Sequence, residues 1–101
     1  MAVLVEFDVL DTTSEQMYEL EARTRARGEA LGRPPFAGCL FLAATPRGST
    51  VHFVSAWRTE EAFREVLASM LGPDLEAVGA AASDVVVGPI MSMAIPGADA
   101  P

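Results

Sequence analysis

Residues 36–63, FAGCLFLAATPRGSTVHFVSAWRTEEAF, decide the fold of this chain. The stretch contains two runs rich in β-branched and aromatic residues, which predict strands over residues 36–44 and 49–58. Between them lies Thr45-Pro46-Arg47-Gly48, with proline in the second position and glycine in the fourth, the pattern of a type I turn. The two strands are therefore expected to form an antiparallel hairpin.

The hairpin leads directly into a helix. Thr59 is suited to cap this helix, and the two acidic residues after it suit the positive end of the helix dipole. The apolar residues that follow repeat at the helical spacing i, i+3, i+4: Ala62, Phe63, Val66, Leu67, Met70 and Leu71. Gly72-Pro73 is expected to break the helix, with Pro73 starting a short second helix that ends near Gly79.

Two further strands and one further helix complete the pattern. Residues 2–10 are apolar and rich in β-branched residues, which predicts a first strand. A capping-box pattern within residues 12–16 opens a helix over about residues 14–31. Residues 83–95 predict a last long strand, with Gly88-Pro89 marking a bulge or an edge position.

The order strand–helix–strand–strand–helix–strand predicts an α+β fold of the ferredoxin-like βαββαβ class, with a four-stranded antiparallel sheet. Right-handed crossovers place both helices on one face of such a sheet. The other face then lies bare, and in the first strand it carries either Val3 and Val5 or Leu4 and Glu6. Because a bare apolar face is unfavourable in water, we expect a homodimer whose two sheets close into a dimeric α/β barrel.

Composition limits the class of protein. The 101 residues suit a single domain, expected over residues 1–96, with a loose tail over residues 97–101. The net charge of −7 argues against nucleic acid and against anionic membranes as partners. The sequence lacks an apolar run long enough to cross a bilayer, and its single cysteine, Cys39, cannot form an internal disulfide. We therefore expect a cytoplasmic protein.

With these elements placed, residues 51–63, VHFVSAWRTEEAF, resemble the antibiotic-biosynthesis-monooxygenase family of dimeric α/β barrels. Proteins of this family often have a strand that ends in tryptophan, followed by a short capped turn and a helix that begins with Glu-Ala-Phe. The resemblance in element order covers about residues 2–95. It implies the ferredoxin-like fold, the dimer, and activities that include cofactor-free oxygenation of aromatic polyketides and degradation of haem.

The chain departs from the family at several site positions. In the oxygenases an asparagine often stands four positions before the tryptophan, where this chain has Phe53. In the haem degraders an asparagine lies in the first strand, near Glu6 here, and a histidine follows the tryptophan by about ten positions, near Leu67 here. The one histidine, His52, precedes Trp57 instead. Haem ligation is therefore not expected, and we expect no cofactor.

Three residues are candidates for catalysis. Trp57 could stack on an aromatic substrate or donate a hydrogen bond through its indole N–H, or it could seal the core. Glu6 could act as a general base if its strand face meets the helices, because burial raises the pKa of a carboxyl group; otherwise it is a surface acid. His52 could act as a general acid or base, or as a hydrogen-bonded residue inside the dimer.

The remaining candidates would line an apolar pocket between the sheet and the helices. These substrate-binding candidates are Phe53, Ser55, Phe63, Leu67, Met17 and Met91. No metal site is expected, because a lone histidine without a ligand partner at the usual spacing does not hold a metal.

We expect the protein to bind or act on a hydrophobic, aromatic or polyketide-like metabolite. Cofactor-free monooxygenation, acid/base cyclisation or isomerisation, and ligand binding without catalysis all remain open.

Overall fold

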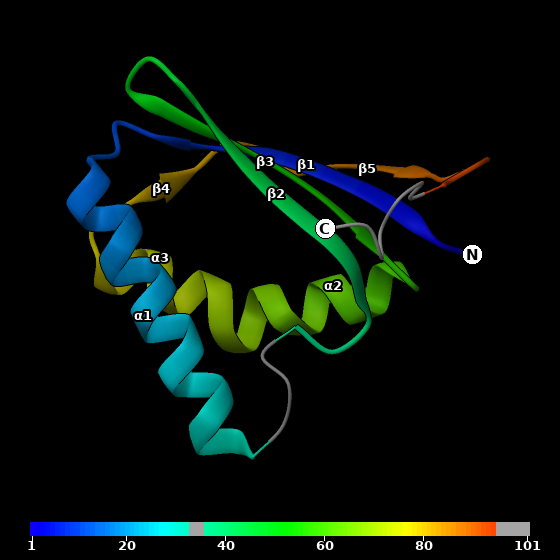
Figure 1. Cartoon of the computed structure of the whole chain (residues 1–101), viewed down its shortest axis with the longest axis horizontal. Helices are drawn as coiled ribbons and strands as arrows, with labels where there is room; N and C mark the ends of the chain where they lie inside the picture. The colour runs from blue at the N-terminus through cyan, green and yellow to red at the C-terminus, as the bar shows by residue number, and fades with distance from the viewer. Residues whose placement is uncertain (33–35, 95–101) are drawn as a thin grey trace, which may run out of the picture.

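One antiparallel sheet and one layer of helices make up the protein (Figure 1). The computed structural model describes residues 1–32 and 36–94. The elements are, in chain order, β1 (Val3–Leu10), α1 (Ser14–Leu31), β2 (Cys39–Arg47), β3 (Thr50–Trp57), α2 (Glu60–Val66), the π-helical segment η1 (Leu67–Leu71), α3 (Gly72–Ala77), β4 (Ala81–Ala82) and β5 (Val86–Pro89). No helix within these residues is long and apolar enough to cross a membrane.

The sheet has the strand order of a ferredoxin-like fold. β3 lies between β2 and β1, and both β4 and β5 pair with the other side of β1, so that together they serve as the fourth strand. All three α-helices lie on the same side of the sheet (Figure 1). The α+β fold with an antiparallel sheet is thus confirmed, and the opposite face of the sheet carries no helix in the described part of the chain.

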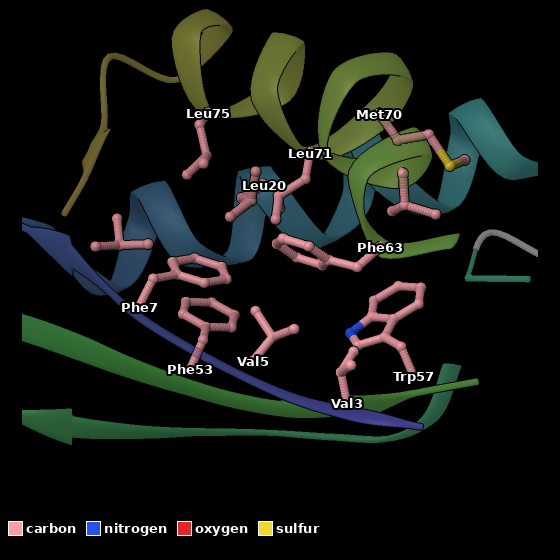
Figure 2. Packing of buried hydrophobic residues seen from close by; sticks show 12 residues of the cluster. Val3, Val5, Phe7, Leu20, Phe53, Trp57, Phe63, Met70, Leu71 and Leu75 are labelled. Carbon is pink, nitrogen blue, oxygen red and sulfur yellow. The ribbon is translucent and has the colours of Figure 1, made fainter. Parts of the chain in front are cut away.

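The structure decides which face of β1 meets the helices. Val3, Val5, Phe7 and Val9 are buried, and Figure 2 shows the first three pointing from the sheet toward the helical layer. The alternate residues of β1, including Glu6, lie on the outer face and remain partly exposed. The apolar side of a strand is buried against the helices because this removes most non-polar area from water.

The hairpin between β2 and β3 turns later than its sequence predicts. Arg47 pairs with Thr50, so the connection is the two-residue turn Gly48-Ser49, and Pro46 lies within β2. Gly48 has φ +64°, which suits the first central position of such a turn because glycine adopts this conformation without strain. The type I turn prediction was therefore wrong. Proline is tolerated at its place because β2 is an edge strand.

The second helical region continues where a break was predicted. The backbone stays right-handed helical from Glu60 to α3, and the N–H of Gly72 donates a hydrogen bond to the carbonyl of Leu67 across a wider π-helical turn. Pro73 then falls in the first turn of α3, where its missing N–H costs little. The predicted short helix after Gly72 is present as α3. The predicted break before it is wrong, because η1 connects α2 to α3.

The last strand is shorter and more irregular than predicted. Val9 pairs with Ala82 but Glu6 pairs with Val86, so an extra residue is accommodated between β4 and β5. Ser83 holds this bulge, because its hydroxyl accepts a hydrogen bond from the N–H of Asp8 at 2.8 Å. The bulge therefore lies before Val86 rather than at Gly88-Pro89. The alternative of an edge position for Gly88-Pro89 holds, because β5 pairs with β1 alone among the described strands and ends at Pro89. Ile95 and the predicted tail lie outside the described residues.

Candidate ligand-binding cavity

A cavity of about 410 Å³ lies between α1 and the inner face of the sheet. Its walls come from β1, β2, β3, α1, α2 and η1, and aromatic side chains dominate its interior. The aromatic members are Phe7, Tyr18, Phe36, Phe53, Trp57 and Phe63. A volume of a few hundred Å³ with a mostly apolar lining is typical of small-molecule sites.

The rings of the cavity wall hold one another in place. Phe7 and Phe53 are stacked, with ring centroids 5.2 Å apart and an interplanar angle of 5°. Trp57 meets Phe63 edge to face, with centroids 5.5 Å apart. Figure 2 shows these side chains projecting from β1, β3 and α2 toward the same interior space. Such contacts add to the stability gained by burial, and they give the wall a fixed form.

Trp57 is held by a hydrogen bond within its own strand. Its indole Nε1 donates to the hydroxyl oxygen of Ser55 at 2.8 Å, and each residue is only 1% exposed. The two side chains can meet because residues two apart in a strand lie on the same face of the sheet. This bond satisfies the indole N–H, which would otherwise be costly to bury.

Polar side chains of α1 surround the entrance. Tyr18, Glu21 and Arg25 recur along one face of the helix, and all three line the cavity while remaining well exposed. Arg25 Nη2 lies 2.6 Å from Glu21 Oε1 in an exposed ion pair. Charge is therefore confined to the solvent-facing mouth, and an aromatic interior lies behind it.

A buried carboxylate joins α1 to α3. Asp74 is 1% exposed and accepts hydrogen bonds from the hydroxyl of Thr24 at 3.2 Å and from Arg27 Nη2 at 2.7 Å. The hydrogen bond to Asp74, together with its charge, raises the pKa of the Arg27 guanidinium above its ordinary value. Because Thr24 also lines the cavity, this cluster sets the position of the cavity wall formed by α1.

A second group of functional side chains lies on the outer face of the sheet. His52 is directly opposite Asp8 in the register of β1 and β3, and its Nδ1 is 2.7 Å from Asp8 Oδ1. Its Nε2 is 3.4 Å from Glu6 Oε1. The side chains of Glu6 and Asp8 are 43% and 38% exposed, whereas that of His52 is 14% exposed. The three residues form a connected acid–histidine–acid cluster.

The predicted catalytic residues do not share one site. Trp57 faces the cavity, whereas Glu6 and His52 lie together on the opposite face of the sheet. Of the two alternatives left open for Glu6, the structure selects the partly exposed acid on the outer face and rules out a general base beside Trp57. The physical reason is the strand register: Val5 pairs with Ser55, so Glu6 pairs with Val54 and shares the outward face of that residue.

The predicted ligand-contacting residues divide in the same way. Four of them line the cavity: Met17, Phe53, Ser55 and Phe63. Leu67 packs against the hydrophobic core and is not among the residues that line the cavity. Met91 is 99% exposed beyond the end of β5, so its assignment to the pocket is corrected.

Sequence reasoning missed the contribution of α1 to the entrance. Glu19 and Glu21 each stand four residues before an Arg along this helix, a pattern typical of a solvated face. The helical spacing of Tyr18, Glu21 and Arg25 placed them on one stripe, but no pattern in the sequence shows that the stripe borders a cavity. Within residues 1–32 and 36–94 there is no group of three or more histidine, cysteine or acidic residues that could hold a metal ion.

Comparison with solved structures identifies the fold. SnoaB, a cofactor-independent oxygenase from Streptomyces nogalater, superimposes with a TM-score of 0.59 at 15% identity, over 94% of this chain and 96% of its own. A putative antibiotic biosynthesis monooxygenase from Chloroflexus aurantiacus gives 0.59 at 14% identity, over 94% and 99%. NE2512 from Nitrosomonas europaea, a protein of unknown function, gives 0.63 at 16% identity, over 95% and 96%.

The chain has the fold of the antibiotic-biosynthesis-monooxygenase-like proteins, which confirms at the level of the fold the resemblance noted in residues 51–63. No family model matches the sequence, and no curated protein matches it. At this level of identity the likeness establishes the fold alone.

Proposed function

We propose that the protein binds a hydrophobic aromatic small molecule in the cavity between α1 and the sheet. The observation that carries this proposal is the set of aromatic side chains around Trp57, which borders about 410 Å³ of space rather than filling it. A core that served stability alone would be close-packed, because unfilled volume forfeits dispersion contacts. Flat apolar ligands would recover those contacts by stacking on the rings.

The distribution of charge supports an uncharged ligand. Glu21 and Arg25, the charged residues at the cavity, pair with each other at its mouth, where water can solvate them. The interior offers the indole and hydroxyl of Trp57 and Ser55 as its polar groups, together with Thr24 at the wall. A carboxylate or an ammonium group on the ligand would therefore lose its hydration without gaining a charged partner.

Cofactor-independent oxygenation is the second candidate function, and the similarity in fold to SnoaB favours it. It ranks second because such a reaction begins with removal of a proton from the substrate, and the described residues that line the cavity include no buried carboxylate or histidine. The test is oxygen uptake when a dihydroxynaphthalene is added to the metal-free protein under air. Uptake above the protein-free rate that disappears in Trp57→Phe would support oxygenation.

We further propose that the protein forms a homodimer through the outer face of the sheet. Phe41 and Val86 are 37% and 64% exposed there, and Leu4 and Val54 lie between them on the two central strands. Burying such a face against a copy of itself would remove apolar surface from water. The acid–histidine–acid cluster would enter this interface with several of its polar atoms already partnered.

Ligand binding can be tested through the single tryptophan. A proton–nitrogen correlation spectrum contains one indole resonance, from Trp57, and this resonance reports directly on the cavity. Titration with 1-naphthol is expected to shift it in a saturable manner. Ala44→Phe adds a ring to the cavity lining and should weaken binding, whereas Ala43→Phe makes the same change on the opposite face of β2 and should not. Equal effects of the two substitutions would contradict a site in the cavity.

A further inference from the structure

We infer that the cavity selects aromatic ligands that carry a hydrogen-bond-accepting oxygen, a carbonyl or phenol oxygen, and that the hydroxyl of Ser55 recognises this oxygen. The inference rests on the proposed function of the cavity and adds the chemical class of its ligand. It assigns Ser55 a role in specificity that is separate from its contact with Trp57.

The hydrogen-bonding capacity of Ser55 is only partly used. A serine hydroxyl has one donor and two acceptor sites. One acceptor site receives the indole N–H of Trp57 at 2.8 Å. The hydroxyl hydrogen has no acceptor among the hydrogen bonds formed by the described residues, although Ser55 is only 1% exposed. The side chain lines the cavity, so a ligand atom in the cavity is the partner within reach.

Because Ser55 is buried, its unused O–H donor affects the free energy of ligand binding. A buried hydroxyl without an acceptor costs free energy, and at 1% exposure water does not remove that cost in the free protein, so an apolar ligand would leave it in place. An oxygen on the ligand would avoid it. Donation from Trp57 to the serine oxygen also makes the serine O–H a stronger donor, because successive hydrogen bonds in a chain polarise one another.

The other polar side chains of the lining are already committed. The hydroxyl of Thr24 donates to Asp74 at 3.2 Å. Arg25 and Glu21 pair with each other, and Tyr18 is 73% exposed at the mouth. Among the described residues that line the cavity, Ser55 therefore supplies the interior donor that awaits a partner, and it stands two residues from the aromatic ring on which a ligand would stack.

A matched pair of probes tests the inference. Tetralin and 1-tetralone share a bicyclic skeleton, and only 1-tetralone carries a carbonyl oxygen. Their dissociation constants are measured from the Trp57 indole resonance in the wild-type protein, in Ser55→Ala and in Ser55→Thr, which keeps a hydroxyl. We expect Ser55→Ala to raise the dissociation constant of 1-tetralone by about two- to tenfold, the worth of one net hydrogen bond, without weakening tetralin. Ser55→Thr should keep the wild-type preference.

The outcomes separate the inference from the proposed function. If neither probe binds the wild-type protein, the cavity is not a ligand site and the proposed function fails. If both bind and Ser55→Ala weakens them by the same factor, or weakens neither, the cavity binds ligands but Ser55 does not select them. Thermal unfolding of each variant shows whether a loss of affinity reflects a loss of fold.

A measurement on the wild-type protein alone makes the test independent of any variant. The infrared carbonyl stretch of bound 1-tetralone should lie below its frequency in cyclohexane, because a hydrogen bond to the oxygen weakens the C=O bond. A frequency equal to that in cyclohexane would overturn the inference even if the variants failed to fold.

Discussion

Asp74 on α3 and Arg27 on α1 are joined by a hydrogen-bonded ion pair, with Arg27 Nη2 at 2.7 Å from an Asp74 carboxylate that is 1% exposed. The two residues are far apart in the sequence, so the ion pair connects two helices that are not consecutive in the chain. Because α1 forms one wall of the cavity, the pair links the stability of the helical layer to the geometry of the ligand site.

Removing the charge of Asp74 should destabilise the fold. Asp74→Asn keeps the size of the side chain but weakens its hydrogen bonds to Arg27 and Thr24, and we expect a loss of about 1.5–3 kcal/mol in the free energy of unfolding. Urea denaturation measures this loss. Glu76→Gln, the same change at an exposed position of α3, is the control and should have little effect. Equal midpoints for the two variants would show that the buried pair contributes nothing to stability.

Gly72 is expected to be required by the π-helical turn. A Cβ atom at this position would lie 2.7 Å from the carbonyl oxygen of Leu67, a backbone atom that cannot move away easily. Gly72→Ala should therefore lower the midpoint of thermal unfolding, even though alanine is favoured over glycine in helices by about 1 kcal/mol. Gly88→Ala places its new methyl group in open space and serves as the control. A higher midpoint for Gly72→Ala would mean that the turn relaxes without cost.

The proposed dimer should depend on Val86. This residue is 64% exposed on the outer face, so Val86→Lys should leave the isolated subunit folded while placing a charge in the interface. Light scattering should give twice the 10.7 kDa subunit mass for the wild-type protein and a mass near 10.7 kDa for the variant. Ala77→Lys, an exposed position in the helical layer, should remain dimeric. A wild-type mass near 10.7 kDa would contradict the dimer itself.

Glu6 should have no part in ligand binding within the cavity. Its side chain lies on the face of the sheet opposite Trp57, in contact with His52. We expect Glu6→Gln to change the dissociation constant for 1-naphthol by no more than about twofold, because the sheet separates its side chain from the cavity. The titration of the Trp57 indole resonance measures this, with Ala44→Phe as the comparison that should weaken binding. A loss as large as that of Ala44→Phe would return Glu6 to the ligand site.

The thiol of Cys39 should be alkylated slowly, and its alkylation should require a higher pH than that of an ordinary cysteine thiol. Burial raises the pKa of its thiol above the ordinary value of 9.0, although the contact with the Phe41 backbone opposes this. Alkylation by iodoacetamide should therefore be slower in the folded protein than in urea at the same pH. Because the folded state holds this proton more tightly, its contribution to stability is complete below pH 9.0 and is lost as the pH rises through the folded value. Cys39→Ser removes the alkylation signal and identifies its source.

Local sequence patterns predicted much of the fold because their causes are local. The Thr59 cap and the capping box of α1 involve residues three apart, and the structure contains both. The order of strands and helices follows from hydrophobic periodicity in the same way. The exceptions depend on contacts with other elements: Pro46 is accommodated by its edge position, and the bulge before β5 is held by Ser83 against Asp8.

In the candidate site, too, some features follow from local sequence patterns and others depend on contacts between elements. By itself, the sequence determined that Ser55 and Trp57 share a strand face, because side chains alternate along a strand. It named three of the aromatic residues of the cavity as candidates, Phe53, Trp57 and Phe63, but not Phe7, Tyr18 or Phe36. Alternation along β3 also put His52 on the face opposite Trp57, but only the tertiary structure decided that Glu6 lies on that same outer face beside His52, because this depends on the register between β1 and β3. Only the packing of α1, held by Asp74, encloses the cavity and brings Tyr18 and Arg25 to its mouth. Periodicity orients side chains within one element, whereas a cavity is bounded by several elements whose separation no local pattern specifies.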